Sequence, residues 1–327
     1  MRQRQRGAAL IVALLIVTLA ASTAAFAIWQ QSLWVRQLEN VTDRAKADQL
    51  AVGGIDLARN VLKDDKADTS RPPNVDSLNE PWASAIVLPA EDVTLSGQIV
   101  DAQGRFNINN LWQASTAPQP DLVFQFWLKS FVTLLDSLKV PKAQELATAA
   151  ADWIKDDQNG LTDLQYLALD PPYTAPRRPI LDIAELARVK GFDADIIRTI
   201  APYVTAIDTS AVAPTGVTTK LTPVNINTAS AEVLAAVTGL SLNQAQIIVK
   251  QRDSTPYRDL GAFNTAVKAA SPNATCPNAA CDVQSNYFLA TIRVKSGRIE
   301  AGYTVLLDRS QTTTPWPSIK WRKEAAD

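Results

Sequence analysis

An uninterrupted uncharged stretch near the amino terminus, at residues 8–28, constrains the fold of this chain more than any other feature. As a helix rising about 1.5 Å per residue, it is long enough to cross a hydrocarbon layer of about 30 Å. Arg2, Arg4 and Arg6 precede it, and the next charged residue is Arg36. Since arginines favour the cytoplasmic side of an apolar span, we expect a cytoplasmic amino terminus and an exported main domain.

The helical pattern continues beyond this stretch. Apolar residues keep a near-helical spacing as far as residue 62, with charged residues between them. We therefore expect one helix with an apolar anchor at 8–28 and an amphipathic continuation at 29–62. A cleaved secretory signal is the alternative, because small residues near Ala25 and Ala27 could form a cleavage site.

The composition argues against most kinds of enzyme. The chain has no histidine, which removes the usual general base and the commonest zinc ligand, and its two cysteines cannot form a four-thiolate site. It also lacks a P-loop and a G-x-G-x-x-G motif. We expect no catalysis, with a carboxylate-dependent hydrolase using Asp152 and Asp156 or Asp157 as the enzymatic alternative. A net charge of −1 does not indicate nucleic acid as a partner.

Short strand-like runs occur at two distant places in the chain. Residues 93–101 and 105–108 predict a hairpin, and the other runs lie at 287–294, 298–307 and 319–323. Because a lone hairpin is only marginally stable, the two groups are expected to share one sheet. The helical patterns between them then form an insertion. Within it, an offset of 48 residues aligns two helix–glycine–helix hairpins around Gly191 and Gly239.

The residues before the apolar stretch resemble those of type IV pilin-like proteins, with Arg6-Gly7 followed directly by Ala8. The resemblance implies cutting after Gly7 by the prepilin peptidase, followed by N-methylation of Ala8. Most members carry glutamate as the fifth residue after the cut, where this chain has Val12. A carboxylate in lipid needs a charged neighbour, so a subunit without it needs no such partner above it, as at a filament tip.

Four further strings carry a more specific resemblance: DAQGRFNINNL at 101–111, ADWIKDDQNG at 151–160, LALDPPY at 167–173 and TPVNINTASAEVL at 222–234. With them, the chain resembles the K-type minor pseudopilins of type II secretion. The resemblance implies an inner-membrane protein that joins I- and J-like minor pseudopilins at the tip of the periplasmic pseudopilus. That filament drives folded proteins across the outer membrane.

The implied fold is α+β. A long amino-terminal helix packs on a small antiparallel pilin-like sheet, and a large α-helical domain is inserted into that sheet. The expected segments are a leader at 1–7, the span at 8–28, its continuation at 29–62, the first part of the sheet domain at 63–110, the inserted domain at 111–275 and carboxyl-terminal strands at 276–327.

An acidic cluster in the inserted region predicts a calcium site. Its oxygen-bearing side chains are Asp152, Asp156, Asp157, Asn159 and Asp163, with Gly160 allowing a sharp turn. Hard oxygen ligands of this kind suit Ca²⁺. The resemblance implies such a loop, although the family usually has an acidic pair after the glycine and this chain has one acid. A solvated acidic loop is the alternative.

Cys276 and Cys281 are the only cysteines, separated by four residues in an expected oxidising compartment. We expect a disulfide, with a redox-active pair as the alternative. Residues 224–263 also resemble a helix-hairpin-helix unit of DNA receptors, but Ser241 replaces the second turn glycine. Four bases against three acids over residues 223–270 are few for phosphate binding. A DNA-uptake or competence pseudopilin is therefore the alternative function, and no nucleic acid is expected.

Overall fold

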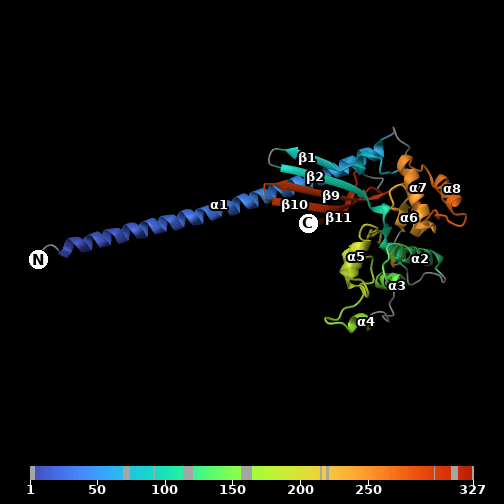
Figure 1. Cartoon of the computed structure of the whole chain (residues 1–327), viewed down its shortest axis with the longest axis horizontal. Helices are drawn as coiled ribbons and strands as arrows, with labels where there is room; N and C mark the ends of the chain where they lie inside the picture. Colours follow the sequence, from blue (N-terminus) through green and yellow to red (C-terminus); the bar gives the residue numbers. More distant parts are fainter. Residues whose placement is uncertain are drawn as a thin grey trace.

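The computed structural model describes residues 4–68, 74–90, 93–112, 121–155, 164–213, 216–218, 221–297, 299–310 and 316–325. Its longest element is α1 (Arg4–Ala67), a single helix of 64 residues. At about 1.5 Å per residue this helix is about 95 Å long. Figure 1 shows its amino-terminal part projecting alone, while its carboxyl-terminal part lies along a sheet.

One antiparallel sheet of five strands packs on α1. Its strands, in spatial order, are β1 (Ile86–Ala90), β2 (Val93–Asp101), β9 (Tyr287–Ser296), β10 (Ile299–Asp308) and β11 (Ser318–Glu324). The two central partners, β2 and β9, come from opposite ends of the insertion and pair from Val93 with Ser296 to Asp101 with Phe288. The predicted α+β fold, with a helical region inserted into one sheet, is therefore confirmed.

The predicted hairpin between residues 93–101 and 105–108 is wrong. Ala102–Gly104 forms a 3₁₀ turn after β2, capped by the Asp101 side chain, which accepts from the Gln103 N–H. The next strand, β3 (Phe106–Asn107), leaves the sheet and pairs in parallel with β4 (Val204–Thr205). The hairpin partner of β2 is instead β1, whose Pro89 suits an edge strand because it cannot donate a ladder hydrogen bond.

The carboxyl-terminal part of α1 packs tightly on the sheet. Its buried face carries Ala47, Ala51, Ile55, Ala58 and Leu62, at spacings of three and four residues, and it meets Phe288, Ala290, Ile292 and Val294 of β9. The helix continues through Gly53 and Gly54 without a break. A Cβ atom on Gly54 would lie 2.6 Å from Ile292 Cγ2, so this glycine lets the helix approach the sheet closely.

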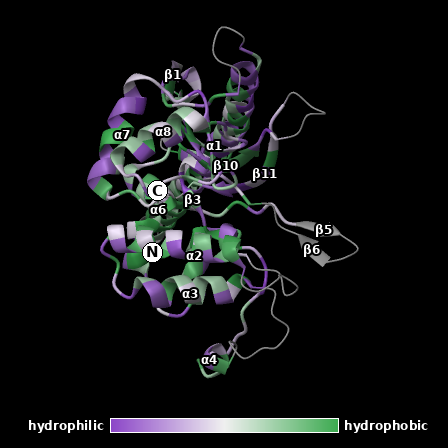
Figure 2. Cartoon of the chain, turned by 90° about the vertical axis from the view of Figure 1, so that its right-hand side faces the viewer, coloured by the Kyte–Doolittle hydropathy of each residue, from purple (hydrophilic) through white to green (hydrophobic). Residues whose placement is uncertain are grey.

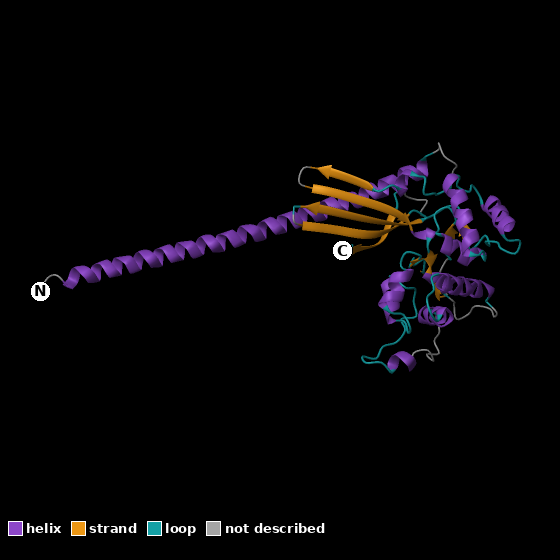
Figure 3. Cartoon of the chain, in the orientation of Figure 1, coloured by secondary structure: helices purple, strands orange, loops and turns teal. Residues whose placement is uncertain are grey.

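The inserted region has a separate hydrophobic core. Its helices are α2 (Leu122–Ser137), α3 (Ala143–Ile154), α4 (Leu164–Leu167), α5 (Ala194–Ile200), α6 (Ala231–Thr238), α7 (Leu242–Ser254) and α8 (Leu260–Ala270), with a 3₁₀ helix at Ile183–Arg188. Its remaining short strands are β5 (Ala211–Ala213), β6 (Gly216–Thr218), β7 (Val224–Asn225) and β8 (Cys281–Asp282). These helices gather at the end of the sheet distant from the amino terminus (Figure 3), and α4 lies at their periphery (Figure 2).

The boundaries of the inserted domain differ from the expected 111 and 275. Phe106, Ile108 and Leu111 are fully buried in the core of the helical domain. Cys276 and Cys281 belong to the same core. The change from sheet to inserted domain therefore lies at the end of β2, and the return lies just before β9. These boundaries lie where the chain passes from one hydrophobic core to the other, and the local sequence pattern does not show that change.

Both predicted helix–glycine–helix hairpins are present. Gly191 and Gly239 adopt positive φ angles of 92° and 79°, the left-handed conformation that favours glycine. The caps also match at the 48-residue offset, because Asp193 caps α5 and Ser241 caps α7 through the same type of side-chain bond. The two hairpins therefore share one local design.

A second internal similarity involves two Asn-Ile-Asn segments, at residues 107–109 and 225–227. The Asn109 amide donates to the Ile180 carbonyl at 2.8 Å and accepts from its N–H at 2.7 Å. Asn227 makes the same two-way bond with Tyr257, at 2.9 Å in both directions. Each of these two buried asparagines therefore forms two hydrogen bonds with the backbone of one distant residue, as a neighbouring strand would.

The two glycines in α1 provide a matched test of the helix–sheet contact. We expect Gly54→Ala to lower the free energy of unfolding by about 1–3 kcal/mol, because the new methyl group overpacks against the β-branched Ile292. Gly53→Ala should instead raise it by up to about 1 kcal/mol, since nothing lies within 4 Å of its added Cβ and alanine favours the helix. Urea denaturation followed by circular dichroism measures both. Equal stability of the two variants would contradict the contact.

Candidate functional site

The first candidate site is the projecting part of α1. Of the helices among the described residues, α1 is the one that is by itself long and apolar enough to cross a membrane. Its apolar side chains are uncovered, with Leu10 66% and Ile28 68% exposed. Gly7 and Ala8, the predicted processing residues, lie in the first turns of this helix, at the start of the uncharged stretch. Such a surface requires lipid or other apolar helices around it.

The second candidate is a buried polar junction where α1, the sheet and the inserted domain meet. Arg309, just after β10, pairs with Asp65 of α1 at 2.9 Å and also with Asp76, in the connection that follows α1. Its Nε donates to the Ser285 carbonyl at 3.0 Å. The guanidinium also lies over the Phe288 ring, 4.6 Å from the centroid. One arginine therefore joins the end of α1, the connection that follows α1 and the segment that leads into β9.

Asp101, at the end of β2, is the other centre of this junction. Its Oδ2 accepts from Asn225 Nδ2 at 2.9 Å and from the Thr228 and Ser285 hydroxyls, each at 2.6 Å. Its Oδ1 accepts from the Gln103 N–H at 2.7 Å. These donors come from both sides of the inserted domain, so the carboxylate fixes where that domain leaves the sheet and where it returns.

The electrostatics of the junction follow from its burial. Burial raises the pKa of Asp101, although its four donors oppose the shift. Burial also raises the pKa of Asp76, with Arg309 opposing it. Burial disfavours the charge on Arg309, but Asp76 and Asp65 outweigh this effect and raise the pKa of the guanidinium. The junction therefore depends on charges that stabilise one another out of water.

Three carboxylates of this region lie close enough to hold a cation. Ligand oxygens of Asp65, Asp76 and Glu80 lie within 4.8 Å of one another. However, the Arg309 guanidinium already pairs with the first two, and Trp82 Nε1 donates to Glu80 at 2.6 Å. The cation here is an arginine, and the site is structural. The sequence alone does not reveal this cluster, because its residues are scattered between positions 65 and 309 without a local pattern.

The predicted calcium site is represented by one residue. Asp152 lies in the last turn of α3, whereas Asp156, Asp157, Asn159 and Asp163 lie outside the described residues. The alternative catalytic pair, Asp152 with Asp156 or Asp157, is likewise represented by Asp152 alone among the described residues. The donor set itself, four carboxylates and one amide oxygen, fits Ca²⁺. The calcium site stays a prediction.

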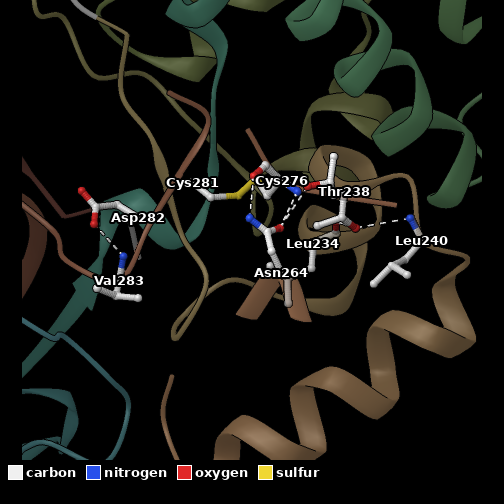
Figure 4. Close-up of a disulfide and its surroundings, with 9 residues drawn as sticks. Leu234, Thr238, Leu240, Asn264, Cys276, Cys281, Asp282 and Val283 are labelled. Atoms are coloured by element: carbon white, nitrogen blue, oxygen red, sulfur yellow. Dashed lines mark hydrogen bonds between the residues drawn. A yellow bond between two sulfur atoms is a disulfide. The ribbon is translucent and has the colours of Figure 1, made fainter. Parts of the chain in front are cut away.

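Cys276 and Cys281 form a disulfide with a Cα–Cα distance of 6.0 Å (Figure 4). Both residues are buried, and the Asn264 amide from α8 accepts from the Cys276 N–H at 2.9 Å and donates to its carbonyl at 3.0 Å. Cys281 also begins β8, which pairs in parallel with β7. An enclosed bond beside a strand favours a structural role over redox chemistry, which needs exposed thiols.

In the hairpin between α6 and α7, the Ser241 N–H and the Arg252 guanidinium, which could bind a phosphate, form hydrogen bonds within the fold instead. The Ser241 N–H donates to Gln244 Oε1 at 3.0 Å within a capping box. Arg252 is buried, and its guanidinium donates to the carbonyls of Ile226 and Ala229. The geometry therefore favours a packing role for the hairpin and gives no support to DNA binding.

Replacing Arg309 tests the junction. We expect Arg309→Met to lower the free energy of unfolding by about 3–5 kcal/mol, because Asp65 and Asp76 lose their cation in a buried site. The loss should shrink as the pH falls from 8 towards 4. The pKa of Asp76 is already raised by burial, and a carboxyl with a raised folded pKa destabilises the fold only when ionised. Urea denaturation at several pH values measures this.

The control is Arg198→Ala, which breaks a pair whose side chains are 75% and 85% exposed. Such exposed pairs contribute about 0–1 kcal/mol. Adding Asp76→Asn to Arg309→Met should recover part of the lost stability. A pH-independent loss, or one no larger than in the control, would mean that the junction charges do not stabilise the fold.

The chain matches family models described as "Type II secretion system (T2SS), protein K" at residues 104–209 and 224–280. It is 35% identical to the type II secretion system protein K of Pseudomonas aeruginosa, over 80% of this chain and 77% of that protein. It is 30% identical to the protein K of Aeromonas hydrophila, over 91% of each. These relatives are secretion proteins, and the DNA-uptake alternative finds no support among them.

The fold is also similar to a chain in the crystal structure of the GspK-GspI-GspJ complex from enterotoxigenic Escherichia coli. The TM-score is 0.70 at 23% sequence identity, covering 89% of this chain and 100% of that chain. Most of this chain therefore adopts a fold that is already known. Together with the similarity in sequence, this arrangement shows that the chain belongs to the type II secretion system protein K family.

Proposed function

We propose that this chain is a minor pseudopilin at the tip of the type II secretion pseudopilus. There it assembles with other minor pseudopilins to initiate or cap the filament that exports folded proteins across the outer membrane. The observation that carries this proposal is α1, one uninterrupted helix whose first part is apolar and uncovered and whose second part is packed on a sheet. This arrangement joins a membrane anchor rigidly to a folded domain.

The uncovered surface of α1 supports assembly. Beyond the predicted span at 8–28, Trp29 is 58% exposed, Trp34 is 70% exposed, and Leu38 and Val41 are each 67% exposed. Large apolar side chains of this kind are typical of interaction sites. Neighbouring helices of a filament, running beside α1, would cover them.

Two features support a position at the tip. Val12 replaces the usual glutamate, so no amino terminus of a subunit above is needed to pair with a buried carboxylate. The inserted helical domain also lies at the end of α1 distant from the anchor (Figure 1), where it adds bulk beyond the sheet. A subunit with this shape can end a filament more readily than it can continue one.

The partners follow by analogy with the solved relative, which is described as a complex of GspK, GspI and GspJ. We propose that I- and J-like minor pseudopilins bind this chain in the same way. Its role is then to assemble, without catalysis.

The proposed topology is a single pass through the inner membrane, with a cytoplasmic amino terminus and a periplasmic main domain. The arginines before the uncharged stretch support this orientation. Prepilin peptidase would cut after Gly7, before the apolar stretch, so that α1 survives processing with a methylated Ala8. The disulfide between Cys276 and Cys281 suits an oxidising compartment.

Mass spectrometry of the mature protein tests this pathway. The mature chain should begin at methylated Ala8, and Gly7→Val should leave the leader attached, because a bulky side chain disturbs the residue at the cut bond. Ala9→Val, beyond that bond, is the matched control. The mature protein should co-purify with two other minor pseudopilins from the inner membrane. A mature chain that begins after Ala25, free of the membrane, would refute the pathway.

We further propose that Asp152, Asp156, Asp157, Asn159 and Asp163 bind Ca²⁺. The carboxylates would repel one another without a cation, so binding should stabilise the folded protein. Millimolar Ca²⁺ should raise the melting temperature of the full chain in detergent, and Asp157→Asn should reduce that rise. Asp195→Asn, at an 85% exposed side chain on α5, is the control and should leave it unchanged. No shift at millimolar Ca²⁺ would refute the site.

A further inference from the structure

A groove separates the sheet from the inserted domain, on the face of the sheet opposite α1. Since side chains alternate along a strand, Ile292 of β9 faces α1 while Thr291 faces the groove. The groove has a volume of about 370 Å³, within the range typical of binding sites. We call it the interdomain groove; its lining includes Val100, Thr291, Thr304, Trp321, Leu181 and Val204.

Arg105 lines this groove and is poorly compensated there. Its side chain is partly buried. Among the described residues it donates one long hydrogen bond, 3.5 Å from Nη1 to the carbonyl of Ala201 at the end of α5. A guanidinium has five N–H donors. The nearby Asp101 carboxylate already accepts from four other groups. Burial lowers the pKa of Arg105, with Asp101 opposing, so its charged form would gain from an anion in the groove.

A second cation lies across the groove. Lys323 of β11 pairs with Asp182, which caps the 3₁₀ helix of the inserted domain. Both side chains are substantially exposed, at 49% and 37%, and exposed pairs contribute little to stability. An incoming carboxylate could therefore replace Asp182 beside Lys323 at low cost.

The groove continues beyond this ion pair. A neighbouring hollow of about 360 Å³ shares Leu181, Asp182, Trp321 and Lys323 with it. The two hollows together are lined by five lysines and arginines and two aspartates. Two of these cations have contacts outside the lining, because Arg293 pairs with Glu300 and Arg322 lies over the Tyr303 ring, whereas Arg105 and Lys323 face the groove. Leu181, 50% exposed, and the Trp321 ring supply apolar surface in the groove, and Lys323 Nζ lies over that ring, 5.2 Å from its centroid. Cations and apolar side chains that line two adjoining hollows fit an extended acidic peptide better than a compact anion.

We propose that the interdomain groove binds an extended acidic peptide segment of another protein. One carboxylate of the segment pairs with Arg105 and a second replaces Asp182 beside Lys323, while an apolar side chain of the segment packs between Leu181 and Trp321. The groove lies on the sheet face opposite α1, so binding there leaves the filament-forming helix uncovered. This activity is separate from the assembly proposed above.

Peptide binding to the full chain in detergent tests this groove. The probe is a short, end-capped, fluorescein-labelled peptide that alternates glutamate and leucine, and fluorescence anisotropy measures its affinity. The matched peptide with glutamine in place of glutamate should bind at least about tenfold more weakly, because it forms no charge-assisted bonds. Rising salt should also weaken binding of the acidic peptide.

Substitutions locate the binding. Arg105→Gln should lower the affinity at least about tenfold and Lys323→Gln about threefold. Arg198→Ala, at an exposed arginine on α5 outside the groove lining, should leave it within about twofold. Equal binding of the two peptides, or unchanged affinity of Arg105→Gln, would overturn the proposal. If Arg105→Gln does not fold, the charge reversal Lys323→Glu decides: loss of binding supports the groove and unchanged affinity refutes it.

Discussion

The close contact between α1 and the sheet positions every other part of this molecule. Gly54 allows the helix to approach Ile292, and a row of small and branched side chains on α1 fills the space along β9. Because α1 is one helix, this contact also connects the anchor to the folded domain without a hinge.

The buried junction extends this arrangement to the inserted domain. Arg309 connects the end of α1 to the segment that leads into β9. Asp101 accepts hydrogen bonds from residues on both sides of the inserted domain. Pairs of this kind are costly to bury and still more costly to break, so the loss of one partner destabilises the whole arrangement. The interdomain groove is a result of that arrangement, because the sheet face and the inserted domain meet at a fixed distance.

The inserted domain uses the same local structures twice. Two hairpins use a positive-φ glycine between capped helices, and two asparagines each bind both polar groups of a remote backbone unit. These turns and hydrogen bonds satisfy buried backbone groups in a large helical domain that has no long strands. They also explain a DNA-receptor-like pattern around Gly239 in which the Ser241 amide and Arg252 serve the fold itself.

Local chemistry alone determined the anchor, the helical continuation and the existence of one split sheet, because hydrophobic period and charge are properties of neighbouring residues. The same holds for the hairpin glycines and for the spacing of the cysteines. Only the tertiary structure decided that Phe106 leaves the sheet, that β1 pairs with β2, and that Arg309 meets Asp65 and Asp76. Those outcomes depend on contacts between residues far apart in the chain, and the burial that makes them favourable exists only after folding.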